Sequence, residues 1–176
     1  QWEKYPREIA YREGDCFLRP EQSHTEFKSA CTEANIGTLI WGDSHAAALS
    51  NGWRVNRDAH QLNASGCAPI INSEFPLRQH CSDINRHIID VVAEQKYDTV
   101  ILHAYWARYS DEQLENLPLT ITELQNIGVS NIVLIGGVPR YSPSLPSRLV
   151  KERTPLNMIE FIEETLFSRI NKIINE

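Results

Sequence analysis

The stretch that decides the fold is LIWGDSHAAAL, residues 39–49. Its first three residues are apolar and typical of a buried strand, whereas the alanines and the leucine after Ser44 favour a helix. Gly42, Asp43 and Ser44 connect the two as a tight turn. Asp43 or Ser44 is expected to cap the helix, because a side-chain oxygen there can accept a hydrogen bond from the free N–H groups of the first turn. A serine hydroxyl at this position also meets the positive end of the helix dipole, so Ser44 is also a candidate nucleophile.

The rest of the chain alternates apolar strand patterns with helical patterns. Strands are predicted at 37–41, 59–64, 98–106 and 131–139, and helices at 44–56, 82–95, 110–128 and 155–176. Ser82 is expected to cap the helix at 82–95, and Pro118 to kink or interrupt the one at 110–128, which Gly128 ends. Residues 1–36 look irregular, and 138–150 form a proline- and serine-rich surface loop.

This alternation predicts an α/β fold, a single domain over residues 1–176 with a parallel sheet and helices on both faces. In open sheets of this kind, sites lie at the carboxyl ends of the strands. Ser44 and the segments 65–69, 103–108 and 136–140 all follow predicted strands. We therefore expect them to line one crevice.

The four cysteines, Cys16, Cys31, Cys67 and Cys81, suggest disulfides. No pair has the spacing of a zinc site or a C-x-x-C redox motif, so neither a metal nor a cofactor is expected. Of the three possible connectivities we favour Cys16–Cys31 with Cys67–Cys81, because each closes a short local loop in an oxidising compartment. Four buried free thiols in a cytosolic protein are the alternative.

Composition excludes some classes of function. The formal net charge is -6, and no basic run offers a track for nucleic-acid phosphates. No stretch reaches the roughly 20 consecutive apolar residues that cross a bilayer, and the N-terminal residues lack the order of a signal peptide. The expected partner is therefore neither nucleic acid nor the membrane interior.

The segment WGDSHAAAL, residues 41–49, resembles the first block of the SGNH (GDSL-like) hydrolase superfamily. Its G-D-S-H form is similar to that of the SGNH domains fused to membrane acyltransferase-three proteins. SGCAPI at 65–70, VILHAYWARY at 100–109 and NIVLIGGVPRY at 131–141 resemble later segments of the family. The resemblance implies a flavodoxin-like, three-layer α/β/α fold.

The resemblance also implies roles for individual residues. Ser44 corresponds to the family's nucleophile, in a turn supported by Gly42, Asp43 and His45. Its backbone N–H and a glycine of the second block, for which Gly66 is the candidate, would form the oxyanion hole.

The third block departs from the family pattern, because HAYWARY contains no asparagine. It offers Trp106, whose indole N–H could donate to substrate or whose ring could form the pocket wall. It also offers Arg108, which could orient a substrate carboxylate or phosphate or form a surface salt bridge.

The family's acid–base pair is missing from these residues. The last aspartate is Asp111 and the last histidine is His103, so no D-x-x-H follows the fourth strand. We expect the chain to stop short of the final strand and this motif. Substitution by another histidine is the alternative.

By resemblance, the function is that of a periplasmic domain of an inner-membrane O-acyltransferase. It would transfer an acyl group, typically acetyl, through a serine ester to a cell-surface polysaccharide such as lipopolysaccharide, with the acyltransferase-three domain as its partner. The alternatives are a GDSL-like esterase or deacetylase and a catalytically degenerate glycan-binding domain.

Overall fold

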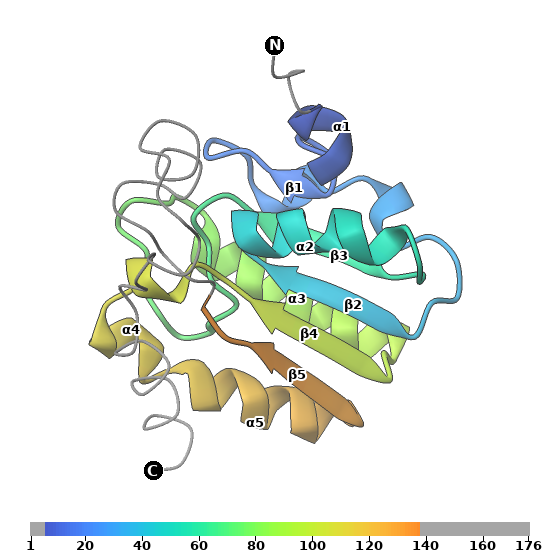
Figure 1. Cartoon of the computed structure of the whole chain (residues 1–176). Coiled ribbons are helices and arrows are strands. Elements are labelled where there is room, and N and C mark those ends of the chain that lie inside the picture. The colour runs from blue at the N-terminus through green and yellow to red at the C-terminus, as the bar shows by residue number, and fades with distance from the viewer. Residues whose placement is uncertain (1–5, 138–176) are drawn as a thin grey trace, which may run out of the picture.

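The computed structural model describes residues 6–137. They contain a five-stranded sheet in the order β1-β3-β2-β4-β5, with every neighbouring pair parallel (Figure 1). The strands are β1 (Phe17–Leu18), β2 (Thr38–Gly42), β3 (His60–Ala64), β4 (Thr99–His103) and β5 (Asn131–Ile135). The helices are α1 (Arg7–Tyr11), α2 (Ser44–Arg54), α3 (Cys81–Gln95), α4 (Asp111–Leu114) and α5 (Leu117–Ile127). The predicted α/β class is confirmed.

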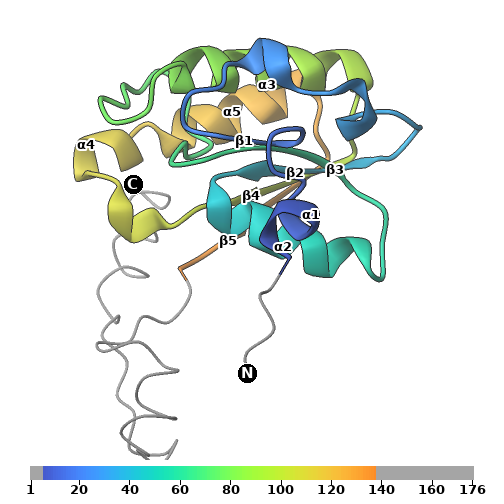
Figure 2. The ribbon, with the colours of Figure 1, turned by 90° about the horizontal axis from the view of Figure 1, so that it is seen from above.

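The helices cover both faces of this sheet. Viewed from above, α1 and α2 lie on one face and α3 and α5 on the other, which gives the predicted three layers (Figure 2). The order β3-β2-β4-β5 is flavodoxin-like, and β1 extends the sheet beyond β3. Right-handed crossovers produce this arrangement, because β2 connects to β3 across one face and β3 returns to β4 across the other.

The core follows from the alternation of side chains along β2. Leu39 and Trp41 are buried with the helices α3 and α5, whereas Ile40 is buried with Ala46 on the α2 face. Both faces of the strand are therefore covered, as the continuous apolar run predicts. The small side chain of Ala46 is fully buried, which lets the start of α2 lie close to the sheet.

The N-terminal segment corrects the prediction that residues 1–36 are irregular. Within it, α1 precedes β1, whose Phe17 and Leu18 pair with Asn63 and Ala64 of β3. A two-residue strand has no periodic pattern to read, so the sequence could not reveal it. Short 3₁₀ turns follow at His24–Glu26 and Ser29–Cys31.

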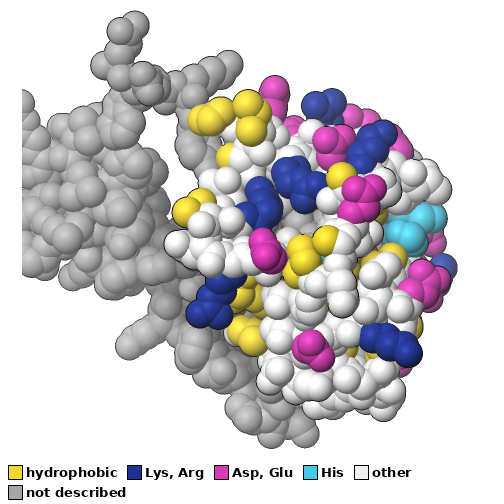
Figure 3. Space-filling view, turned by 90° about the vertical axis from the view of Figure 1, so that its right-hand side faces the viewer, with side chains coloured by type: hydrophobic (Ala, Val, Ile, Leu, Met, Phe, Trp, Pro, Cys, Tyr) yellow, Lys and Arg dark blue, Asp and Glu magenta, His cyan; other side chains and the backbone are white. Residues whose placement is uncertain are grey.

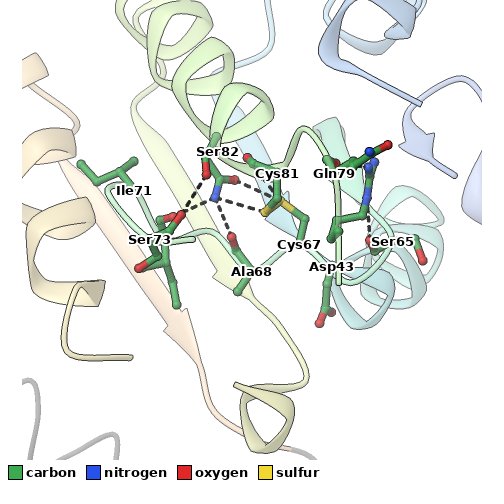
Figure 4. Close-up of a disulfide and its surroundings, with 12 residues drawn as sticks. Asp43, Ser65, Cys67, Ala68, Ile71, Ser73, Gln79, Cys81 and Ser82 are labelled. Carbon is green, nitrogen blue, oxygen red and sulfur yellow. Dashed lines mark hydrogen bonds between the residues drawn. A yellow bond between two sulfur atoms is a disulfide. The ribbon is translucent and has the colours of Figure 1, made fainter. Parts of the chain in front are cut away.

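The start of α3 also differs from the prediction. His80 holds the N-cap position with a left-handed backbone (φ 63°), and Ser82 lies inside the first turn. The Ser82 hydroxyl donates to the Ser73 carbonyl at 2.9 Å, so it holds the preceding loop instead of capping the helix (Figure 4).

Other predicted elements are shorter than expected, including the strand predicted at 131–139, which ends at Ile135. The strand at 98–106 ends at His103, after which a 3₁₀ turn covers Trp106–Arg108. The helix predicted at 110–128 is two helices, and Pro118 lies in the first turn of α5, where a missing N–H costs no hydrogen bond. Gly128 ends α5 in a left-handed conformation, as predicted. The loop at 138–150 and the helix at 155–176 lie outside the described residues.

The sheet has an amino edge, from which its strands start, and a carboxyl edge, where they end. Figure 3 views the amino edge, and acidic and basic side chains are interspersed over it. The opposite edge, where the strands end, carries the loops that the sequence singled out. No helix between residues 6 and 137 is long and apolar enough to cross a membrane.

Both predicted disulfides are present. Cys16 bonds Cys31, which ties β1 to the segment before β2, and Cys67 bonds Cys81, which ties the loop after β3 to the first turn of α3. Figure 4 shows the second bridge beside Ala68. This pairing favours an oxidising compartment.

Each bridge should stabilise the fold through the unfolded chain. Replacing Cys67 and Cys81 by serine removes a crosslink with a sequence separation of 14, which should lower the free energy of unfolding. The chain-entropy model gives a loss of about 3 kcal/mol, measurable by urea denaturation. The matched control is the Cys16/Cys31 double variant, with a separation of 15. A loss below about 1 kcal/mol for both would contradict the entropic account.

Candidate functional site

The candidate site lies where β2 and β4 end. These strands are neighbours, but the helix after β2 covers one face of the sheet and the helices after β4 turn toward the other (Figures 1 and 2). A crevice opens at such a switch point in open α/β sheets. The register places Gly42 opposite both Asn63 and His103, so the segments after β2, β3 and β4 start at the same level.

Gly42 is required by the close approach of β4. A Cβ at this position would lie 1.7 Å from the carbonyl oxygen of His103 and 3.0 Å from the Cβ of Ala46. Its φ of 155° is also one that side-chain-bearing residues rarely adopt. The glycine therefore lets the chain turn into α2 directly against the end of β4.

Asp43 is the N-cap of α2 and is 1% exposed. Its Oδ1 accepts from the backbone N–H of His45 at 2.8 Å, as expected for a cap. Its Oδ2 accepts from the backbone N–H of Tyr105 and from the Tyr109 hydroxyl, both at 2.9 Å. One buried carboxylate thus joins the turn after β2 to the segment after β4.

Tyr109 is the partner that the sequence did not predict. Burial, followed by the neighbouring Asp43 carboxylate, raises the pKa of its hydroxyl far above the usual value. The hydroxyl therefore stays protonated and serves as a donor. No local pattern around residue 109 indicates this contact, which spans 66 residues of sequence.

Ser44 is the first residue of α2 and is partly exposed. Its hydroxyl makes no hydrogen bond within residues 6–137, in contrast to Asp43 beside it. The free backbone N–H groups of the helix's first turn point toward the same region. Asp43 is thus the cap, and Ser44 presents an unengaged hydroxyl at the positive end of a helix.

Two histidines, His45 and His103, contact each other next to the turn that carries Ser44. The His45 ring stacks on Tyr105 at 4.8 Å, with an angle of 4° between the planes, and meets the His103 ring edge-on at 5.9 Å. The Nδ1–H of His103 donates to the Ile135 carbonyl at 3.1 Å. Burial, and then His45, lower the pKa of His103, although the Ile135 bond opposes the shift. His103 is thus a buried histidine whose Nδ1 holds β5.

Trp106 is fully buried, and its indole N–H donates to the carbonyl of Ile135 at 2.7 Å. Its donor is therefore already engaged in this structure. In the described residues Trp106 is a core side chain: it has no exposed surface, and it belongs to the same core cluster as Leu102 and Leu124.

Gly66 and Arg108 lie side by side at the carboxyl edge. Gly66 has a left-handed φ of 64°, and a Cβ there would lie 3.7 Å from Nη2 of Arg108. The Arg108 side chain is exposed and forms neither an ion pair nor a hydrogen bond with any described residue. The predicted surface salt bridge is thus absent from this part of the chain, and the guanidinium lies across the loop that carries the candidate oxyanion glycine.

The loop after β3 is held from inside by Asn85 of α3. Its Nδ2 donates to the carbonyls of Ala68 and Ile70, both at 2.8 Å, and its Oδ1 accepts from the indole of Trp41 at 3.2 Å. Asn85 is fully buried, as is the adjoining Cys67–Cys81 bridge. A polar residue on the apolar stripe of a predicted helix is the signal that could have revealed it.

Arg78 holds the same loop from the other side. The side chain is buried, and it donates to the carbonyls of Ser65 (3.0 Å), Arg19 (2.9 Å) and Gln22 (2.8 Å) and to that of Gln79. Each of these acceptors is a neutral backbone oxygen. The loop of Gly66 is therefore fixed by a buried cation on one side and by Asn85 on the other.

Of these residues, Gly66, Arg78, Arg108 and Tyr109 border a groove of about 480 Å³, whereas Ser44 is not among its lining residues. Its walls are Gly66, Phe75, Pro76, Leu77, Arg78, Arg108, Tyr109 and Gln113. Elsewhere within residues 6–137, no three His, Cys, Asp or Glu side chains come close enough together to hold a metal ion.

Replacing Gly42 by alanine should prevent the native packing of β2 against β4. The new Cβ would overlap a backbone oxygen that cannot move without opening the sheet, so we expect a loss above about 4 kcal/mol or no folding. Gly52→Ala is the control, because nothing lies within 4 Å of its Cβ position inside α2, where alanine should stabilise by about 1 kcal/mol. Circular dichroism during urea denaturation measures both. Equal stability of the two variants would refute this role of Gly42.

The variant Asp43→Asn tests the link of Asp43 to the segment after β4 separately from its role as the helix cap. Asparagine caps helices as well as aspartate does, so the bond to His45 can remain. Its amide N–H₂ would then face the N–H of Tyr105, and a buried donor left unpaired costs about 1–3 kcal/mol. The control is Asp83→Asn, which removes an exposed pair with Arg86 and should change unfolding by less than about 1 kcal/mol. Equal losses would mean that Oδ2 contributes nothing.

Comparison with known proteins agrees with this geometry. The family model for SGNH domains (fused to AT3 domains) matches residues 10–175. A comparison with curated proteins gave no match. Among solved structures, the periplasmic domain of a lipopolysaccharide acetyltransferase from Salmonella ser. Paratyphi A is similar, with a TM-score of 0.69 and 18% identity over 96% of this chain and 72% of that chain. At this identity the likeness shows a shared fold. Because the family match covers nearly all of the sequence, the chain belongs to the SGNH domain family (fused to AT3 domains).

Proposed function

We propose that this domain is the periplasmic acyl-transfer domain of an O-acetyltransferase that acts on a cell-surface polysaccharide, with Ser44 as nucleophile. The observation that carries the proposal is the unengaged Ser44 hydroxyl at the start of α2, in a turn that Asp43 locks to the segment after β4. Family membership and the fold shared with an acetyltransferase's periplasmic domain support it. The disulfides support a periplasmic location.

In the proposed reaction, Ser44 Oγ attacks the acetyl carbonyl and loses its proton to a base. The backbone N–H groups of Ser44 and Gly66 stabilise the oxyanion, and the donor's leaving group departs to leave an acetyl-serine ester. The base passes its proton to the leaving group. It then takes the proton of the sugar hydroxyl that attacks the ester, and it returns this proton to the serine oxygen. An AT3 domain is proposed as the supplier of the acetyl group.

The base has no assigned residue among the 176. The sequence contains no D-x-x-H, and the Nδ1 of His103 is engaged with Ile135. A glycan-binding domain without chemistry of its own is the second candidate function, which the test below distinguishes from the first. The test is therefore made on the full-length protein.

Ser44→Ala in the full-length protein should lower acetyl transfer to polysaccharide at least about a thousandfold, as removal of a catalytic serine does in other hydrolases. Acetyl esters on the purified polysaccharide are counted by NMR. Ser29→Ala, which removes an exposed hydroxyl paired with Glu33, is the control and should retain transfer.

The outcomes separate the alternatives. Transfer by Ser44→Ala within tenfold of wild type refutes the nucleophile. Release of free acetate at the same rate with and without polysaccharide identifies an esterase. Glycan binding without transfer by the unaltered protein identifies the degenerate domain.

A further inference from the structure

The groove beside Gly66 has an uneven distribution of charge. Two of its walls are arginines, Arg78 and Arg108, and none of its lining residues is acidic. The acidic side chains begin farther along, where Glu74 and Glu112 line the adjoining hollow beyond Pro76. A negatively charged ligand would therefore be attracted to the arginine end and repelled from the other.

Arg108 is the residue able to contact such a ligand. Its exposed guanidinium has no acceptor among the described residues, although five N–H donors in a planar fork suit a carboxylate or phosphate. Its position over Gly66 places it next to the loop that we assign to the oxyanion hole. A ligand anion would supply the missing acceptor.

Arg78 contributes positive charge to the groove, but its N–H groups are engaged within the protein and are not available to the ligand. Its guanidinium is buried and donates to backbone carbonyls, so its positive charge is solvated but not neutralised by any contact. Glu21 and Glu26 act on it electrostatically, and neither of them lines the groove. The arginine end of the groove therefore carries two guanidinium groups and no acidic lining residue.

The rest of the groove suits the ring of a sugar. Leu77 is 88% exposed beside Pro76, and the buried rings of Phe75 and Tyr109 meet edge-on at 6.0 Å behind them. Leu77 and Pro76 give this part of the groove a small apolar surface. The C–H face of a pyranose can pack on this surface while its substituents reach Arg108 and Gln113.

We infer that this groove binds an anionic saccharide, with the carboxylate or phosphate of the sugar held by Arg108. This inference rests on the proposed function and gives it a substrate class, an acidic acceptor glycan. Tyr109 connects the groove to the nucleophile, because its ring lines the groove and its hydroxyl holds Asp43, the residue before Ser44.

Binding is measured by calorimetry on the full-length protein with four probes. They are an oligogalacturonide, its carboxyl-reduced neutral counterpart, a phosphorylated oligosaccharide and inorganic phosphate. The unaltered protein should bind at least one acidic saccharide tighter than the neutral one. Arg108→Gln should weaken that binding about tenfold to a hundredfold, the value of a hydrogen bond between charged groups.

The control is Arg57→Gln. Arg57 lies before β3, at the opposite edge of the sheet, where its guanidinium is 5.7 Å from the centre of the Trp53 ring. The Arg57→Gln variant should leave saccharide affinity unchanged. Arg108→Lys should restore part of the affinity, because lysine keeps the charge but not the fork.

Binding of only the uronate or only the phosphorylated sugar would support the inference and identify the anion. The inference is overturned if the protein binds no saccharide, or binds neutral and acidic saccharides equally. It is also overturned if Arg57→Gln and Arg108→Gln lose equal affinity, or if inorganic phosphate binds as tightly as a sugar. Because binding is measured without turnover, these results are independent of acetyl transfer by Ser44.

Discussion

The buried carboxylate of Asp43 is the interaction on which the candidate site depends. Its two oxygens accept three hydrogen bonds, one from α2 and two from the segment after β4. A carboxylate is stable in this surrounding because charged acceptors with several donors offset the cost of burial. Since Gly42 lets β4 approach closely, the same residue can both cap the helix and reach across the crevice.

The loop after β3 is fixed independently of Asp43. Asn85 and the Cys67–Cys81 bridge tie it to α3, and Arg78 ties it to the N-terminal segment beside β1. The short strand β1 and the Cys16–Cys31 disulfide therefore help to fix the site, although β1 is the outermost strand of the sheet. They hold the carbonyls of residues 19 and 22 to which Arg78 donates.

The parts of the structure that sequence could predict are those set by local patterns. The strands at 37–41 and 59–64, the turn through Ser44 and both short-range disulfides follow from apolar runs, cap residues and cysteine spacing. The Tyr109–Asp43 and Arg78–Arg19 contacts join residues more than 50 positions apart, and no periodicity in the sequence indicates them. The two-residue strand β1 was missed because pairing with β3, not its own pattern, makes it a strand.

Polar groups at this edge of the described structure fall into two kinds. Most are satisfied within the fold, and these hold the geometry: Asp43, Arg78, Asn85, His103 and Trp106. Ser44 and Arg108 have no hydrogen-bond partner within residues 6–137, yet they lie at the switch point and beside Gly66. These two groups add no hydrogen bond to the described fold. In the proposals above, Ser44 would react with an acyl donor, and Arg108 would donate to the anion of a sugar. In the proposal, the hydrogen-bonded groups build the site, and Ser44 and Arg108 are the unpaired groups that would contact the substrate.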